Sequence, residues 1–182
     1  MFRLIAMGLC LLLSLTACAH RMLPAPAVAL PPLRLAPAAL GKTIAVQQRL
    51  HFEFGRQQRD MDALLEVDAG EVRLAVQAMG QSGVRLQWDG QQLHEQRAAW
   101  LPAAVRSERV LDDLQFALWP TERIRAVLPA GWTIEDDGRE RRLMQDGAAW
   151  LVLTRESAQS LRIENRAEGY RLDIETVMEA SP

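Results

Sequence analysis

The sequence predicts a mainly β protein with an α-helical insert, in which a strongly curved antiparallel half-barrel is covered by two short helices. Hydrophobic and polar residues alternate over most of residues 42–97 and 132–178, as they do in strands that bury one face. Between these stretches, at about 105–129, hydrophobic residues recur at the spacing of a helix. Short turns favour antiparallel pairing, and an open sheet of about nine or ten strands tends to curl.

The first half of the domain is expected to be a meander of about five strands. The alternation is clearest in its first strand, where one face is formed by Ile44, Val46, Leu50, Phe52 and Phe54. His51 falls on the opposite, polar face. A solvated strand histidine is expected there, and a catalytic histidine is the alternative.

The helical insert is marked by residues that begin and end helices. Ser107 is expected to cap the first helix and Thr121 the second. The first helix should end at Trp119 because Pro120 follows it, and Pro129 should stop the second. If the helices leave space over the concave face of the sheet, an apolar pocket for acyl chains results. If they fill it, the same residues form an ordinary core.

Candidate residues for the wall of such a pocket are the large apolar side chains of the inward faces and of the insert. They are Phe52, Phe54, Trp88, Leu114, Leu118, Trp119, Trp132 and Trp150.

Charged residues gather at three places in the second half of the chain. They are Asp112-Asp113, Asp136-Asp137 and the basic cluster Arg139, Arg141 and Arg142. Paired carboxylates can serve catalysis, but both pairs are interpreted as solvated charge. The basic cluster is interpreted as an exposed hairpin face, with contact to anionic headgroups as the alternative.

Composition and motifs exclude several classes of function. The net charge of −2 offers no broad basic surface, so nucleic-acid binding is not expected. None of the three histidines has a metal-ligand spacing. Nucleophile elbows and phosphate loops are absent from the sequence. We therefore expect a non-catalytic monomer without a metal, and with no cofactor other than a covalent lipid.

That lipid is suggested by the N-terminus. Arg3 precedes an apolar run from Leu4 to Leu15, which is too short to span a hydrocarbon core of ~30 Å and has the form of a signal peptide. The run ends in Leu15-Thr16-Ala17-Cys18, which resembles the lipobox of bacterial lipoproteins. This resemblance implies cleavage after residue 17 and acylation of Cys18. A signal peptide with an incidental cysteine is the alternative.

The segment after Cys18 divides the chain into regions. Ala19, by resemblance to bacterial sorting rules, favours the outer membrane, with the protein facing the periplasm. Residues 18–41 are rich in proline and alanine and are expected to be a semi-rigid tether. The alternative is that residues 30–40 pack onto the domain as an irregular first segment. The folded domain is expected at 42–178, followed by a tail at 179–182.

The order of these elements, together with several local motifs, resembles the family of the outer-membrane lipoprotein receptor LolB, whose fold is the LolA/LolB-like half-barrel. The motifs are Ala78-Met79-Gly80-Gln81-Ser82, Leu118-Trp119-Pro120-Thr121 and Ala130-Gly131-Trp132. A second similarity is to LolB-like lipoproteins encoded beside aryl-polyene and pigment-lipid synthesis genes. It is carried by residues 63–68, 108–115 and 117–120.

The resemblance implies an outer-membrane lipoprotein that accepts and delivers a lipid-modified or lipid-like cargo, such as a lipoprotein or a polyene lipid. It places Met79 and Gly80 in a loop that contacts membrane or cargo, with methionine where the family has leucine. It implies a LolA-like periplasmic carrier or an export machine as partner. The alternative is a structural, partner-binding lipoprotein with a filled core that assists an envelope export machine.

Overall fold

The computed structural model describes residues 28–101 and 105–177, which form an open antiparallel sheet of ten strands. The strands of the first half are β1 (Ile44–Phe54), β2 (Gln57–Val67), β3 (Val72–Ala78), β4 (Gln81–Trp88) and β5 (Leu93–Arg97). Those of the second half are β6 (Trp132–Asp136), β7 (Glu140–Gln145), β8 (Ala148–Arg155), β9 (Ser160–Asn165) and β10 (Tyr170–Val177). The helices are η1 (Pro37–Leu40), α1 (Ser107–Leu118) and α2 (Thr121–Arg125).

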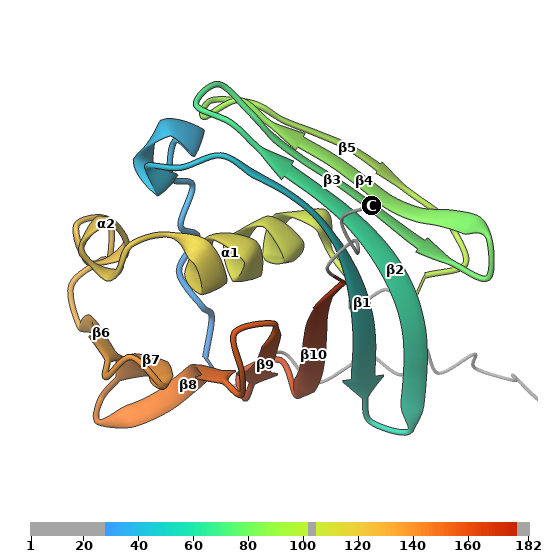
Figure 1. Cartoon of the computed structure of the whole chain (residues 1–182). Coiled ribbons are helices and arrows are strands. Elements are labelled where there is room, and N and C mark those ends of the chain that lie inside the picture. Colours follow the sequence, from blue (N-terminus) through green and yellow to red (C-terminus); the bar gives the residue numbers. More distant parts are fainter. Residues whose placement is uncertain (1–27, 102–104, 178–182) are drawn as a thin grey trace, which may run out of the picture.

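The two halves of the sheet join through the first and last strands. β1 pairs with β10 from Gln47 opposite Val177 to Phe54 opposite Tyr170. The strand order β5-β4-β3-β2-β1-β10-β9-β8-β7-β6 therefore places β5 and β6 at opposite edges. The chain between them carries α1 and α2 across the concave side of the curved sheet (Figure 1). The predicted fold class, a curved half-barrel with a helical insert, is confirmed.

Both helices begin one residue earlier than the sequence suggested, at the residues that were expected to be their caps. Ser107 and Thr121 are the first helical residues, and Arg106 and Pro120 occupy the cap positions without a side-chain cap. The break between the helices is as expected. Trp119 is extended, with φ −71° and ψ 150°, because the residue before a proline is disfavoured in the helical region.

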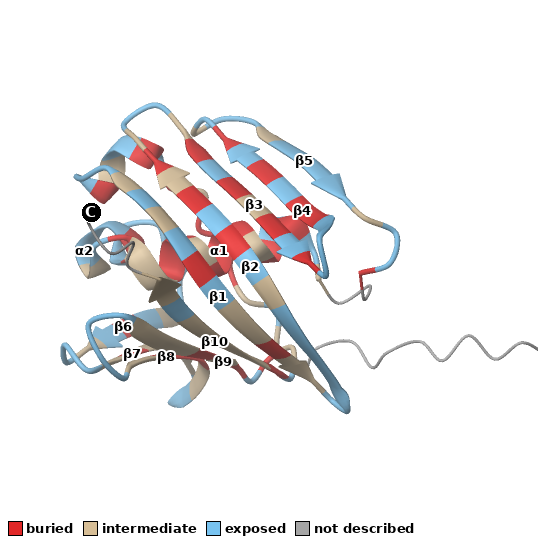
Figure 2. Cartoon of the chain, turned by 45° about the vertical axis from the view of Figure 1, so that its right-hand side comes forward, coloured by how far each residue is buried: buried red, intermediate tan, exposed pale blue. Residues whose placement is uncertain are grey.

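The core lies between the sheet and the insert. Buried residues alternate with exposed ones along the strands (Figure 2), as expected for a sheet covered on one face. The insert contributes fully buried side chains at Leu111, Phe116, Trp119 and Ile124. Among the described residues, no helix has the length and hydropathy needed to cross a membrane.

The segment before β1 is part of this core and not a free tether. Leu33, Leu35 and Leu40 are buried in it. Of the two alternatives for residues 30–40, the structure shows the packed irregular segment, so the folded unit begins before the expected boundary at 42. We call residues 30–40 the N-terminal segment. Residues 18–27, including Cys18, lie outside the described residues.

Hydrogen bonds fix the N-terminal segment between α1 and the sheet. The Leu35 amide donates to Gln115 Oε1 over 2.9 Å, and Gln115 Nε2 donates back to the Leu35 carbonyl over 2.8 Å. Trp88 Nε1 also donates to the Leu35 carbonyl, over 2.8 Å. Trp119 Nε1 donates to the Ala36 carbonyl over 3.1 Å. These side chains satisfy backbone groups that no strand partner reaches.

The end of α1 is held by a buried arginine. Arg141 of β7 donates from Nη1 to the carbonyls of Phe116 and Trp119, over 2.5 and 2.9 Å. Its Nε donates to Asp136 Oδ2 over 2.6 Å. A cation at the C-terminal carbonyls of a helix is favourable. The prediction that this residue belongs to an exposed basic face is wrong, and Asp136 is paired instead of solvated.

Truncating Leu35 tests the packed N-terminal segment. We expect Leu35→Ala to lower the free energy of unfolding by about 2–4 kcal/mol, because buried leucine truncations lose transfer energy and leave a cavity. Leu64→Ala is the matched control, since Leu64 is 46% exposed on β2, and should change it by less than about 0.5 kcal/mol. Denaturant titration measures both values. Equal, small effects would mean that the segment is a free tether.

Candidate functional site

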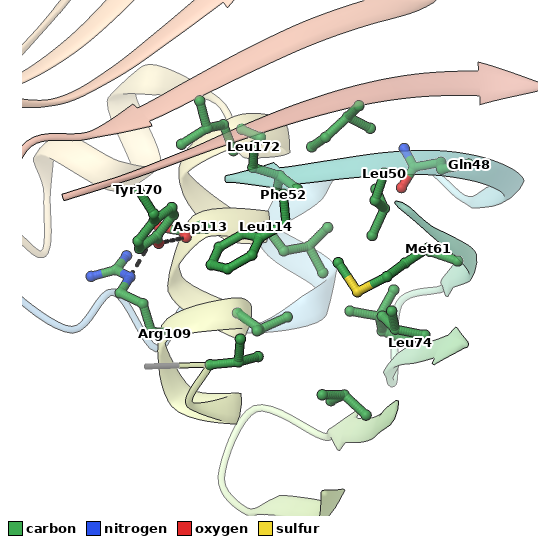
Figure 3. Close-up of a pocket in the computed structure, with 18 of the residues that line it drawn as sticks. Gln48, Leu50, Phe52, Met61, Leu74, Arg109, Asp113, Leu114, Tyr170 and Leu172 are labelled. Carbon is green, nitrogen blue, oxygen red and sulfur yellow. Dashed lines mark hydrogen bonds and ion pairs between the residues drawn. The ribbon is translucent and has the colours of Figure 1, made fainter. Parts of the chain in front are cut away.

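An apolar cavity lies between the concave face of the sheet and helix α1. Its volume is about 110 Å³ and it is partly open to solvent. By the same measure one water molecule needs about 10–15 Å³, so the space exceeds a packing defect. Figure 3 shows the side chains of the sheet and α1 that point into it.

The sheet wall of the cavity follows β1. Gln48, Leu50 and Phe52 are two residues apart and therefore lie on one face of the strand. Leu50 is opposite Ile174 on β10 and Met61 on β2, and both of these residues line the cavity. The floor of the cavity is thus the seam where the two halves of the sheet meet.

The helix wall is one face of α1. Residues at three- and four-residue spacing point toward the sheet, as expected for a helix face. They are Arg106, Arg109, Val110, Asp113, Leu114, Ala117 and Leu118. Most of this face is apolar, and its charged members are Arg106 just before the helix, Arg109 in its first turn and Asp113 near its middle.

Three of the eight predicted cavity residues line the cavity. They are Phe52, Leu114 and Leu118. For Phe54, Trp88, Trp119, Trp132 and Trp150 the prediction is wrong. Trp88 and Trp119 are buried and use their indole N–H groups to hold the N-terminal segment. Trp132 packs against the core from the edge strand β6, and Phe54 lies at the end of β1.

Trp150 shows why alternation alone misplaced a residue. The core side of β8 is formed by Leu151 and Leu153, both fully buried, so Trp150 lies in the opposite phase. The pairing of β7 with β8 shifts between Leu143 and Met144. Such an irregularity re-aims the side chains around it. In an apolar run the sequence does not indicate which phase faces inward.

Met79 and Gly80 form the two-residue turn between β3 and β4. Both have positive φ, at 50° and 72°, the backbone of a type I′ hairpin turn. The Met79 side chain is 89% exposed. The structure thus places both predicted loop residues at a hairpin tip.

The cavity ends at a buried charged cluster that we interpreted from the sequence as solvated. Asp112 and Asp113 are only 5% and 6% exposed. Arg109 Nε donates to Asp113 Oδ1 over 2.9 Å, and the Tyr170 hydroxyl donates to Asp113 Oδ2 (Figure 3). We call Arg109, Asp113 and Tyr170 the buried triad. Burial raises the pKa of Asp113 to about 6, against the attraction of Arg109 and the hydrogen bond from Tyr170.

Asp112 connects the buried triad to the N-terminal segment. Its carboxylate accepts from the Leu33 amide over 3.1 Å and pairs with Arg34. It also lies 3.8 Å from Arg109 Nη1. Burial raises the pKa of Asp112 as well. The signal that sequence reasoning missed was the spacing of Arg109, Asp112 and Asp113, which allows pairs within one helix.

The described lining of the cavity is mostly apolar, and its charged groups are paired. In the part of the chain that the structure describes, no group of three or more His, Cys, Asp or Glu residues is placed to hold a metal ion. The described lining contains no serine, cysteine, histidine or lysine, and its one carboxylate, Asp113, is bonded to Arg109 and Tyr170. His51 lies on the polar side of β1, where it contacts Asp60 over 2.6 Å. The arrangement is suited to holding an apolar molecule.

The buried triad should make stability depend on pH. The pKa of Asp113 is about 6 in the folded protein, above its ordinary value of 3.8, which applies in the unfolded chain. The stability that Asp113 contributes is therefore fully present below about pH 4 and is lost as the pH rises through about 6. The shift corresponds to roughly 3 kcal/mol.

Asp113→Asn removes this titration. Between about pH 4 and 7 the free energy of unfolding of the wild type should fall by roughly 3 kcal/mol relative to the variant. Denaturant titrations across that range measure the difference. The contributions of titrating groups that both proteins share cancel in it. Parallel curves would contradict the raised pKa.

Comparisons with known proteins give a family and no function. Residues 45–178 match a family described as a protein of unknown function, DUF3261. A search of the curated proteins finds no match. The matched range runs from the second residue of β1 to the end of β10 and includes both α-helices and every residue that lines the cavity, but not the N-terminal segment. Because the match spans well over half of the sequence, the chain belongs to the DUF3261 family.

Proposed function

We propose that this protein is a lipoprotein, anchored in the outer membrane through Cys18, that accepts an acyl-bearing cargo and delivers it without covalent chemistry. The observation that carries this proposal is the apolar cavity between the sheet and α1. Burial of each methylene group in such a space is worth about 0.8 kcal/mol. A few buried methylenes would therefore give useful affinity without a catalytic group.

The supports of α1 give the cargo a path. On one side the helix is held to the N-terminal segment through Asp112 and Gln115. On the other side Leu114 and Leu118 meet the cavity instead of a filled core. A chain would enter the cavity between this apolar face of α1 and the sheet, while the polar contacts that hold the helix to the segment and to Arg141 persist.

The packed N-terminal segment shortens the proposed anchor. If Cys18 is acylated, 11 residues separate it from Leu30, a span of at most about 40 Å when extended. The domain would then remain close to the membrane surface. This proximity favours direct handover over long-range capture.

Two exposed apolar side chains at one end of the sheet support a membrane contact. Met79 projects from the β3–β4 turn. Trp100 is 38% exposed, and its ring lies against Gly83 of β4, where a β-carbon would come within 3.4 Å. Tryptophan favours the membrane–water interface, and methionine adapts to irregular apolar surroundings. A LolA-like carrier or an export machine is the proposed source of the cargo.

Filling the cavity tests the acceptor role. Ala63 lines the cavity on β2, so Ala63→Phe should weaken binding of an acyl probe at least about tenfold. Ala75→Phe is the control, because Ala75 lies on the other face of the sheet, outside this cavity. Native mass spectrometry with lipid extraction, on protein purified from its own envelope, measures the bound species. A clean apo mass that added acyl probes do not shift would favour the partner-binding alternative with a filled core.

Substituting the hairpin tip tests delivery separately. Met79→Glu should leave acyl binding intact and reduce transfer to vesicles at least about tenfold, because an exposed carboxylate does not enter an apolar interface. Met79→Leu keeps an apolar tip and should transfer normally. Transfer of a labelled acyl probe from protein to lipid vesicles provides the measurement. Normal transfer by Met79→Glu would remove Met79 from the delivery surface.

A further inference from the structure

A glutamine interrupts the apolar wall of the cavity. Gln48 lies on β1 in phase with Leu50 and Phe52, and it lines the cavity with them. Gln48 is 9% exposed. In the sequence, Gln48 is the one polar residue between Val46 and Leu50 on the inward face of this strand. Figure 3 places its side chain at the end of the cavity away from Tyr170.

The Gln48 amide has no hydrogen-bond partner among the described residues. The facing residue on β2 is Ala63, which offers no polar side-chain atom, and the facing residue on β10, Thr176, makes no side-chain hydrogen bond to Gln48 in the described structure. A glutamine amide has two donors on nitrogen and an acceptor oxygen. The cavity therefore presents a free donor and a free acceptor at one point of an apolar wall.

The other polar groups that line the described cavity are already paired. Arg109 bonds Asp113, which also accepts from the Tyr170 hydroxyl. Arg106 Nη2 donates to Glu168 Oε1 over 2.7 Å. Neither arginine is available as the sole partner of a carboxylate, and a ligand anion near Asp113 would meet a like charge. This lining is poorly matched to the ionised head of a free fatty acid.

We propose that Gln48 binds a secondary amide carried by the cargo, so that the cavity prefers an N-acyl group to a free fatty acid. This inference rests on the proposed acceptor function and names its ligand class. The amide carbonyl would accept from Gln48 Nε2, and the amide N–H would donate to Oε1. An ester can accept but not donate, so it leaves Oε1 without a partner.

The geometry also sets the placement of the chain. From Gln48 to Phe52 the strand rises by about 13 Å. The acyl chain would lie along this part of β1, over Leu50 and Met61, and end near the Phe52 and Tyr170 rings, whose centroids are 5.5 Å apart. The apolar part of the cavity lies between the Gln48 amide at one end and the buried triad at the other.

Three ligands of equal chain length separate the alternatives: N-methyldecanamide, methyl decanoate and decanoate. Their dissociation constants are measured by calorimetry with the full folded domain at about pH 8, where the fatty acid is ionised. We expect the amide to bind tightest and decanoate weakest, with the amide about tenfold tighter than the ester.

Gln48→Leu should remove the advantage of the amide. Its affinity for N-methyldecanamide should fall about tenfold, while that for methyl decanoate changes less than about threefold. The fold should be retained, because leucine is close to glutamine in size and the neighbouring side chains that line the cavity are apolar. Gln48→Met is a second variant of similar shape. Gln47→Leu is the control, since Gln47 is exposed on the opposite face of β1.

The outcomes distinguish this inference from the proposed function. If none of the three ligands binds, the acceptor function itself fails. If they bind but Gln48→Leu leaves the ratio of amide to ester affinity unchanged, the role of Gln48 is overturned and the acceptor function stands. Tighter binding of decanoate than of the amide by the wild type would overturn the ligand class in the same way.

Discussion

Pairing between the first and last strands is the constraint on which the structure depends. Because β1 joins β10, the strands β5 and β6 lie at opposite edges of the sheet. The chain that connects them has to cross the sheet, and it crosses on the concave side (Figure 1). The helices therefore cover the apolar face that the curved sheet would otherwise expose. The position of the cavity follows from this one topological feature.

Helix α1 has a different partner on each side, and this difference leaves the cavity open. One face of the helix bonds the N-terminal segment through Asp112 and Gln115, whose side chains replace missing backbone partners. The opposite face meets β1 and β10 across the apolar space. The segment and the Arg141 contacts fix the height of the helix above the sheet. The side chains between them do not fill the gap.

The polar groups near the cavity divide into two kinds. The buried triad satisfies itself, since Asp113 accepts from both Arg109 and Tyr170. Breaking one member of such a cluster leaves an uncompensated buried charge, which is far more costly than the net value of the pair. Gln48, at the other end, has no described partner. A paired cluster specifies the fold, whereas an unpaired amide in an apolar wall is a place for a ligand.

The sequence by itself determined the elements of this protein. Alternation of apolar residues located the strands, and the proline after Trp119 separated the helices, because both patterns are local consequences of backbone geometry. It also indicated that Met79 lies in a hairpin turn. These features depend on neighbours in the chain. The same local patterns also identified three of the eight candidate cavity residues that do line the cavity, Phe52, Leu114 and Leu118.

The tertiary structure decided what each side chain meets. Trp88 and Trp119 looked like cavity walls, but they hold the N-terminal segment, which lies more than fifty residues away in the sequence. Asp113 looked solvated because its partner Tyr170 comes from the last strand. The phase of Trp150 depended on an irregular strand pairing. Burial and hydrogen bonding between distant segments are set by how the sheet closes on the insert, and a pattern of neighbours does not contain that information.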